Sequence, residues 1–116
     1  MGSRFDGTIG YGVEIPEGFE PNNSPVGWDE FCDWYEYLEE VCQKFDVQYD
    51  VSGYHGEFLG AALFVGETTS IDGVGVFNAN RVSGSPTVEE LERLREASEY
   101  VGVPYKPEFI AVTSYG

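Results

Sequence analysis

Residues 28–45 read WDEFCDWYEYLEEVCQKF, and this stretch decides the fold of the chain. Its apolar side chains recur at spacings of three, four and seven, which places them on one face of a helix. These residues are Phe31, Trp34, Tyr35, Leu38, Val41, Cys42 and Phe45. Four carboxylates, at Asp29, Asp33, Glu36 and Glu40, fall on the opposite side. The stretch therefore predicts an amphipathic helix that buries one face and presents an acidic stripe to solvent.

Strand-like segments flank this helix on both sides. They either alternate apolar with polar residues or run almost continuously apolar, and glycines interrupt several of them. The candidate strands are residues 5–15, 46–54, 58–65, 70–77 and 107–115. In the first, Gly7, Gly10 and Gly12 favour bends and close backbone contacts. The pattern leaves open whether residues 58–77 form one strand or two.

A second helix is expected between Thr87 and Gly102, with clear signals at both ends. Thr87 followed by Glu90 fits a capping box, and Gly102 followed by Pro104 is typical of a helix end. The buried stripe of this helix comprises Leu91, Leu94, Ser98 and Val101. Its outer positions are rich in glutamate, so the outer side of this helix is acidic too.

The order of these elements predicts the fold class. Strand, helix, two or three strands, helix and strand predict an α+β fold, in which an antiparallel sheet of four or five strands carries two helices on one face. The order resembles the ferredoxin-like arrangement β-α-β-β-α-β, which hosts many unrelated activities. The 116 residues suit one core, so we expect a single acidic α+β domain spanning residues 1–116.

The charge balance narrows the range of partners. The chain has 21 Asp and Glu against 6 Lys and Arg, a formal net charge of −15 at pH 7. Such a surface repels nucleic-acid backbone and anionic membrane over about 8 Å at physiological salt, so we expect neither as a direct partner. The same field attracts basic surfaces and speeds association with them. A basic, nucleic-acid-binding protein is therefore the expected partner.

The hydropathy pattern favours the cytoplasm. No stretch approaches the roughly 18 consecutive apolar residues that cross a bilayer as a helix. The first residues also lack the basic-then-apolar pattern of an export signal. We therefore expect a cytoplasmic protein.

Motifs for catalysis, cofactors and metals do not match this sequence. His55, the only histidine, lies at an expected turn, where a general base would need a nearby nucleophile or carboxylate. Cys32 and Cys42 lie too far apart along one helix for a disulfide, and fit neither zinc nor redox spacings. The glycines of residues 7–12 have the wrong spacing for a dinucleotide or phosphate loop. We expect no enzyme, no cofactor and no metal, with both cysteines as structural thiols.

The acidic stripe strains the helix that carries it. Neighbouring carboxylates lie three or four residues apart, where each pair of like charges costs about 0.2 to 0.5 kcal/mol. Only Lys44, four residues after Glu40, offers an opposite charge. From Asp29 to Glu40 the stripe spans about 16 Å, and its charge density is near that of one phosphate per about 3.4 Å of a DNA strand. This density permits mimicry of nucleic acid, although a face that only keeps the protein soluble has the same pattern.

The second helix adds further carboxylates, relieved only by Arg93 and Arg95. If both helices cover one face of the sheet, their outer sides merge into one broad negative surface. An aromatic residue beside that surface would add an anchor for a partner. The predicted partner-binding residues are Asp29, Asp33, Glu36, Tyr37, Glu40, Glu89, Glu92 and Glu96.

Small size, strong acidity and the lack of a catalytic motif resemble the small inhibitor proteins that bacteriophages make against host defences. That class includes anti-CRISPR proteins, antirestriction DNA mimics and the uracil-DNA glycosylase inhibitor. The resemblance is to the class, and it is carried by Asp29, Asp33, Glu36, Glu40 and the glutamates of residues 89–99. It implies a phage protein that acts in the cytoplasm of the host cell.

The sequence therefore predicts a non-enzymatic inhibitor that offers an acidic, nucleic-acid-mimicking surface to a basic protein, such as a phage-defence nuclease complex. Two alternatives stay open. The first is a structural or accessory interaction protein, a homo-oligomer such as a homodimer that buries a sheet face or edge through Phe58, Leu63, Phe64 and Phe77. The second is a small-molecule-binding domain or enzyme that uses His55 and nearby aromatic residues.

Overall fold

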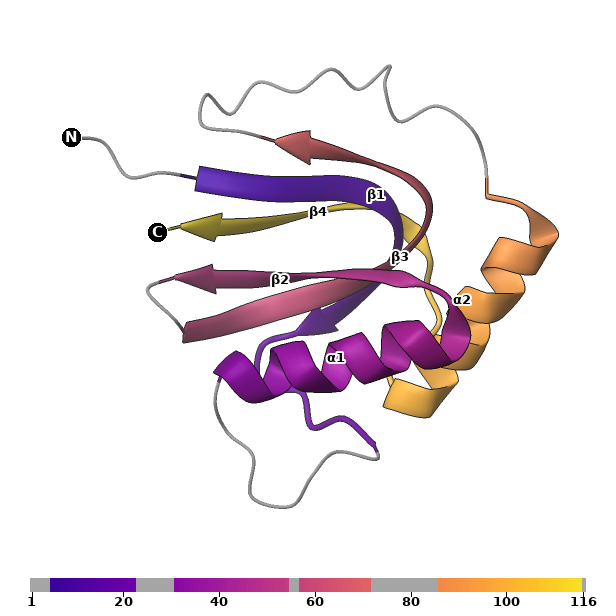
Figure 1. Ribbon diagram of the computed structural model, residues 1–116, viewed down its shortest axis with the longest axis horizontal. Coiled ribbons are helices and arrows are strands. Elements are labelled where there is room, and N and C mark those ends of the chain that lie inside the picture. The colour runs from indigo at the N-terminus through magenta and orange to yellow at the C-terminus, as the bar shows by residue number, and fades with distance from the viewer. Residues whose placement is uncertain (1–4, 23–30, 55–56, 72–85, 116) are drawn as a thin grey trace.

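The computed structural model describes residues 5–22, 31–54, 57–71 and 86–115 of the chain. Within these ranges it contains four strands and two helices (Figure 1). In chain order they are β1 (Phe5–Pro16), α1 (Phe31–Phe45), β2 (Gln48–Tyr54), β3 (Glu57–Ile71), α2 (Val88–Val101) and β4 (Glu108–Tyr115). The predicted α+β class and the predicted order of elements are confirmed.

The four strands form one strongly curved sheet in the order β2-β3-β1-β4, in which each of these neighbouring pairs is antiparallel. β1 and β3 bend along their length, so that β2 and β4 point in the same direction (Figure 1). The ends of β2 and β4 then meet in a short parallel contact, which pairs Gly53 with Ser114 and Tyr54 with Tyr115. This contact closes the sheet into a barrel.

The closed barrel refines the sheet that the sequence predicts. The four antiparallel strands agree with the prediction, whereas the parallel closing contact was not expected. The strand order is not clearly the ferredoxin-like one, so the ferredoxin-like arrangement stays a prediction. Residues 57–71 form a single strand, so residues 58–65 and the start of residues 70–77 belong together. Residues 72–77 lie outside the described residues.

The glycines of β1 bring it close to both neighbouring strands. A Cβ atom on Gly10 would lie only 2.9 Å from the ring of Phe64. A Cβ atom on Gly12 would collide with the backbone carbonyl of Leu63. Any larger residue would force the strands apart, because these distances are shorter than van der Waals contact. A Cβ atom on Gly7 would likewise meet the backbone carbonyl of Val112 in β4. The close backbone contacts predicted for Gly7 and Gly12 are therefore confirmed, whereas Gly10 lies against side chains.

Both helices pack on the same face of the sheet and share one core with it. Trp34 of α1 stacks on Phe58 of β3, with ring centroids 4.2 Å apart. The fully enclosed members of this core, from both helices and from β1 and β3, are Val13, Ile15, Leu38, Val41, Leu63, Leu94, Ala97 and Val101. Each large apolar side chain buried in this way contributes about 1.5 to 3 kcal/mol. The helices are therefore held by their inner faces, which leaves their outer faces to solvent.

β3 is buried on both faces, which explains its nearly continuous apolar sequence. Leu63 points into the core under the helices, whereas Phe64 joins a second, smaller core with Ala62 and Val112. Leu63 is 0% exposed and Phe64 is 1% exposed. The prediction that these two residues form an exposed dimer surface is therefore wrong. Successive side chains of the strand point to opposite faces of the sheet, but the protein itself covers both faces there.

The buried face of α1 differs in detail from the predicted one. Trp34, Tyr37, Leu38 and Val41 are buried, at the helical spacing i, i+3, i+4 and i+7. Tyr35, which the sequence analysis placed on the buried face, is 39% exposed. The side of α1 opposite this buried face is the acidic one.

The ends of α2 follow the sequence signals. The Thr87 hydroxyl accepts a hydrogen bond from the Glu90 backbone N–H, and the Glu90 carboxylate accepts one from the Thr87 N–H. Gly102 ends the helix with a left-handed φ of 97°. The predicted capping box and helix end are both confirmed.

Candidate functional site

The outer side of α1 carries a group of carboxylates that we call the α1 acidic face, comprising Asp33, Glu36, Glu39 and Glu40. Glu36, Glu39 and Glu40 are exposed, and Asp33 is partly exposed. The four side chains border a shallow hollow of about 360 Å³ together with Gln43 and Tyr37. The inner side of α1 is fixed in the core, so the helix holds these carboxylates in a set arrangement.

Three carboxylates of the α1 acidic face are not paired with any cation of the described residues. Within the part of the chain that the structure describes, Glu36, Glu39 and Glu40 form no salt bridge. The sequence suggested that Lys44 relieves Glu40. Instead, the Lys44 ammonium lies over the ring of Tyr100 in α2, 5.4 Å from its centroid. The negative charges of Glu36, Glu39 and Glu40 therefore stay exposed to solvent.

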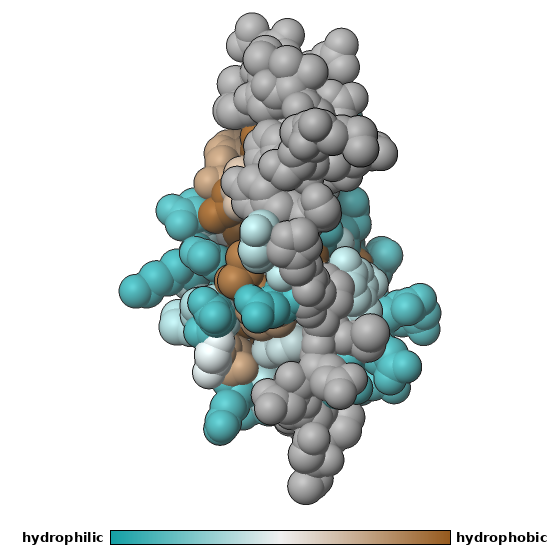
Figure 2. Space-filling view, turned by 90° about the vertical axis from the view of Figure 1, so that its left-hand side faces the viewer, coloured by the Kyte–Doolittle hydropathy of each residue, from teal (hydrophilic) through white to brown (hydrophobic). Residues whose placement is uncertain are grey.

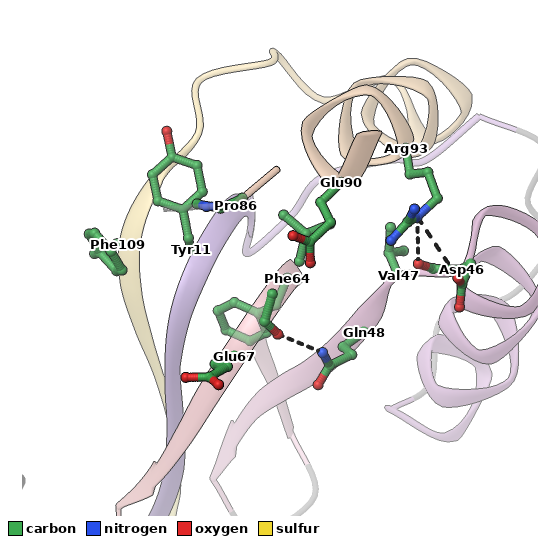
Figure 3. Close-up of a pocket in the computed structure, with 12 residues that line it drawn as sticks. Tyr11, Asp46, Val47, Gln48, Phe64, Glu67, Pro86, Glu90, Arg93 and Phe109 are labelled. Carbon is green, nitrogen blue, oxygen red and sulfur yellow. Dashed lines mark hydrogen bonds and ion pairs between the residues drawn. The ribbon is translucent and has the colours of Figure 1, made fainter. Parts of the chain in front are cut away.

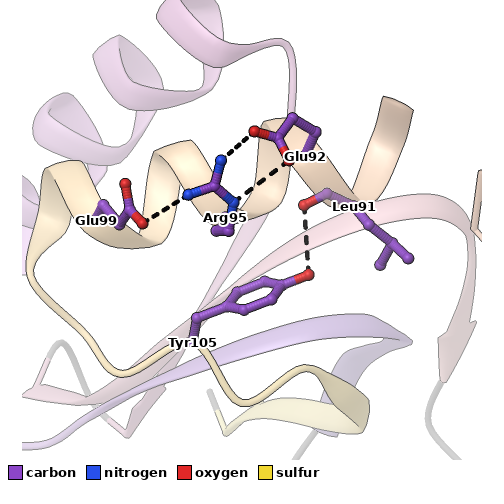
Figure 4. A network of polar contacts seen from close by, with 5 residues as sticks. All are labelled: Leu91, Glu92, Arg95, Glu99 and Tyr105. Carbon is purple, nitrogen blue, oxygen red and sulfur yellow. Dashed lines mark hydrogen bonds and ion pairs between the residues drawn. The ribbon is translucent and has the colours of Figure 1, made fainter. Parts of the chain in front are cut away.

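The carboxylates of α2 are used within the protein to a much greater extent. Arg95 forms ion pairs with Glu92, three residues earlier, and with Glu99, four residues later, the latter at 2.9 Å (Figure 4). The hydrogen bond from Arg95 lowers the pKa of Glu92 below its usual value. The backbone hydrogen bond from Thr87 likewise lowers the pKa of Glu90. Much of the charge that the sequence assigns to α2 is therefore balanced locally.

Two further positive side chains lie where the helices meet. Arg93 of α2 donates from Nε to the backbone carbonyl of Asp46 at 3.2 Å, and the same Nε lies 3.9 Å from the Asp46 carboxylate. Asp46 directly follows α1, and Lys44 lies over Tyr100 nearby. The broad negative surface predicted from the sequence therefore carries two positive side chains, Arg93 and Lys44, between the helices.

The structure separates the predicted partner-binding residues into groups. Asp29 lies outside the described residues. Of the α2 residues, Glu92 is paired with Arg95, whereas Glu89 and Glu96 are exposed and form no salt bridge with any described residue. Glu39 joins the α1 acidic face, although the stripe predicted from helical spacing did not include it. Glu36, Glu39 and Glu40 are thus the larger group of carboxylates without a salt bridge to any described residue.

Tyr37 is not the exposed anchor that the sequence analysis expected. It is 3% exposed, and its hydroxyl donates a 2.6 Å hydrogen bond to the backbone carbonyl of Asn22. Burial, with a smaller contribution from Tyr100, raises its pKa to about 12. Tyr37 therefore stabilises the attachment of α1 to the segment after β1 and offers little surface to a partner.

The candidate catalytic groups have little support in the described residues. His55 and the side chain of Cys32 lie outside them. Cys42 is a free thiol, and burial, followed by the charge of Glu39, raises its pKa to about 12. A thiol with this pKa is almost fully protonated at neutral pH and is a poor nucleophile. Among the described residues there is also no cluster of three side chains that could hold a metal ion.

Apolar residues are exposed where β2 meets β3. Tyr54 is 48% exposed and Leu59 is 39% exposed. Figure 2, which views the side of the molecule that is on the left in Figure 1, shows hydrophobic residues between projecting hydrophilic ones. Isolated exposed apolar residues are common on monomeric proteins, so Tyr54 and Leu59 do not by themselves support the homodimer. No described helix is long and apolar enough to cross a membrane.

Comparison of the chain with family models, curated proteins and solved structures found no match. The proposals below therefore rest on the sequence and on the geometry of the described residues.

Proposed function

We propose that this protein is a non-enzymatic inhibitor that presents the α1 acidic face to a basic, nucleic-acid-binding protein. The observation that carries the proposal is the set of exposed carboxylates at Glu36, Glu39 and Glu40, which no described residue neutralises. These carboxylates lie on a helix whose inner side is fixed in the core, so they need little rearrangement before binding.

The physical basis of the proposal is competition for a nucleic-acid site. A groove that binds a phosphate backbone carries Lys and Arg side chains and attracts any dense array of negative charge. The net charge of −15 adds long-range attraction and speeds the encounter with such a groove. The protein would then occupy the groove and exclude DNA or RNA from it.

The class of partner follows from the same chemistry. A phage-defence nuclease complex has the required basic groove, and the resemblance to small acidic phage inhibitors favours this partner. The host cytoplasm would be the place of action of a phage-encoded inhibitor. The fold itself does not favour one activity, whether or not its strand order is ferredoxin-like, because such folds host many functions.

The test is binding to a captured basic partner by matched variants. The triple variant Glu36→Gln, Glu39→Gln, Glu40→Gln removes charge from the α1 acidic face, and we expect it to weaken binding by at least about tenfold. The control variant Glu14→Gln, Glu17→Gln, Glu57→Gln makes the same change in net charge at exposed positions on other elements. We expect the control to bind nearly as well as the wild type.

The two variants separate local recognition from general attraction. Equal weakening by both would mean that only net charge matters, which would contradict a defined site on α1. Wild-type binding by the α1 variant would overturn the proposal. The homo-oligomer and small-molecule alternatives gain no such specific support, since Leu63 and Phe64 are buried and His55 lies outside the described residues.

A further inference from the structure

A second cavity, of about 460 Å³, lies on a different part of the molecule, where the start of α2 approaches the barrel (Figure 3). Residues from β1, β2, β3, β4 and α2 line it. We call it the barrel-end pocket. Its volume falls in the range of about 300 to 1,000 Å³ that is typical of ligand sites.

One wall of the barrel-end pocket is aromatic. Tyr11 and Phe109 pack edge to face, with ring centroids 5.2 Å apart. Phe109 is 55% exposed, so its ring is accessible to a ligand. The ring contact holds the two aromatic side chains in place, so they offer a preformed apolar and π-electron surface.

The charged groups of the pocket are predominantly negative. Asp46, Glu67 and Glu90 contribute three carboxylates, against the single guanidinium of Arg93. Arg93 already pairs with Asp46. The carboxylates of Glu67 and Glu90 therefore dominate the field inside the pocket, and that field favours a cationic ligand.

The unused hydrogen-bonding groups point to the same ligand. Gln48 donates from Nε2 to the backbone carbonyl of Gly66 at 3.0 Å, which leaves its Oε1 as an acceptor. The Glu67 carboxylate accepts no hydrogen bond from any described residue. Figure 3 shows its side chain extending from β3 toward the aromatic side of the pocket. The pocket thus offers two acceptors, Glu67 on its aromatic side and Gln48 on the opposite side, on β2.

We propose that the barrel-end pocket receives an arginine side chain of the basic partner protein. A guanidinium is planar, donates several hydrogen bonds in one plane and stacks on aromatic rings, whereas an ammonium does not match both features. Glu67 would accept its hydrogen bonds while Tyr11 and Phe109 contact its face, and Gln48 would offer a further acceptor across the pocket. The inference rests on the proposed function only in that the partner is basic, because it uses residues outside the α1 acidic face.

The probe for this pocket is a capped Gly-Arg-Gly peptide, with a capped Gly-citrulline-Gly peptide as the uncharged match. Titration of the ¹⁵N-labelled full chain should shift backbone amides of Gln48, Gly66, Glu67 and Phe109. We expect the citrulline peptide to bind at least about fivefold more weakly, because it lacks the positive charge. Equal binding of both peptides would overturn the proposal, as would shifts confined to residues 36–40.

Substitutions of pocket residues test the same peptide binding by the same titration. Glu67→Gln and Phe109→Ala should each weaken binding of the arginine peptide by about threefold or more. Glu57→Gln, an exposed carboxylate on the same strand outside the pocket, should leave it unchanged. A well-dispersed amide spectrum shows that each variant is folded. Unchanged binding by folded Glu67→Gln and Phe109→Ala would contradict the pocket.

Failure of this inference and failure of the proposed function can be told apart. If only the pocket is misassigned, the arginine peptide does not bind there, while partner binding still depends on the α1 acidic face. If only the proposed function is wrong, the peptide still binds the pocket, and the α1 triple variant binds the partner like the wild type. The α1 triple variant itself should bind the arginine peptide with unchanged affinity.

Discussion

The exposed side of α1 and the exposed side of α2 are both rich in glutamate, yet they use it differently. In α1, Glu36, Glu39 and Glu40 face solvent without a salt bridge to any described residue. In α2, Arg95 holds Glu92 and Glu99, and Glu90 closes the capping box. The difference shows that an acidic helix becomes a candidate binding surface only when its carboxylates are not satisfied within the fold.

The difference also has an energetic consequence. Like charges three or four residues apart destabilise a helix by about 0.2 to 0.5 kcal/mol per pair, whereas opposite charges at the same spacing stabilise it. We therefore expect the like charges of α1 to lower stability and the Arg95 ion pairs of α2 to add to it. A surface that lowers stability without making an internal contact is a candidate binding surface.

The largest predicted effect concerns the buried sides of the helices, where α1 and α2 should behave alike. Leu38 of α1 and Leu94 of α2 are both 0% exposed. Leu38→Ala and Leu94→Ala should each lower the free energy of unfolding by about 2 to 5 kcal/mol, because each leaves a cavity in the shared core. Urea unfolding followed by circular dichroism measures both. A loss confined to one helix would mean that the two helices do not share one core.

The outer side of α2 should show a pH dependence that follows from its ion pairs. Arg95 lowers the pKa of Glu92 in the folded protein. The stability from this pair is present above the ordinary pKa of a glutamate and is lost as the pH falls through the lower, folded-state pKa. Arg95→Gln should therefore lower the Tm at pH 7, with a difference that shrinks toward about pH 3. A difference that stays constant with pH would show that the ion pair does not stabilise α2.

Removing a charge from the outer side of α1 should raise stability, whereas removing Arg95 from α2 should lower it. This effect should be the smallest of the three. Glu36 and Glu40 lie four residues apart, so removing either charge relieves a repulsion. Glu36→Gln or Glu40→Gln should raise the free energy of unfolding by about 0.2 to 0.5 kcal/mol for each like-charge pair removed. Chemical unfolding at low salt measures the gain. Destabilisation by these variants would reveal a stabilising partner for the α1 acidic face.

Local features of this molecule could be predicted from the sequence, since they depend on residues close together in the chain. Thr87 and Glu90 form the expected capping box, and Gly102 ends α2 as expected. Arg95 finds its partners within one helical turn on either side. Tyr37 could also have been assigned to the core, because it completes the spacing i, i+3, i+4 and i+7 with Trp34 and Val41.

The remaining features depend on contacts between distant residues, which a single sequence does not specify. Lys44 has a carboxylate one turn away, but it lies over Tyr100 on another helix. Arg93 contacts Asp46, which is in a different element. The parallel contact between β2 and β4 requires the bends of β1 and β3, and the barrel-end pocket combines residues from five elements. Each depends on how the elements pack, and helical or strand periodicity carries no information about that.

The salt dependence of binding between this protein and its basic partner shows whether the α1 acidic face is the binding surface. We expect the Kd of the wild type to rise at least about tenfold from about 0.05 to about 0.5 M salt, because added ions screen exposed charge pairs. The variant Glu36→Gln, Glu39→Gln, Glu40→Gln should bind more weakly and with a shallower salt dependence. DNA or RNA should displace the wild-type protein. A Kd that does not change with salt, or equal binding by the variant, would contradict the account.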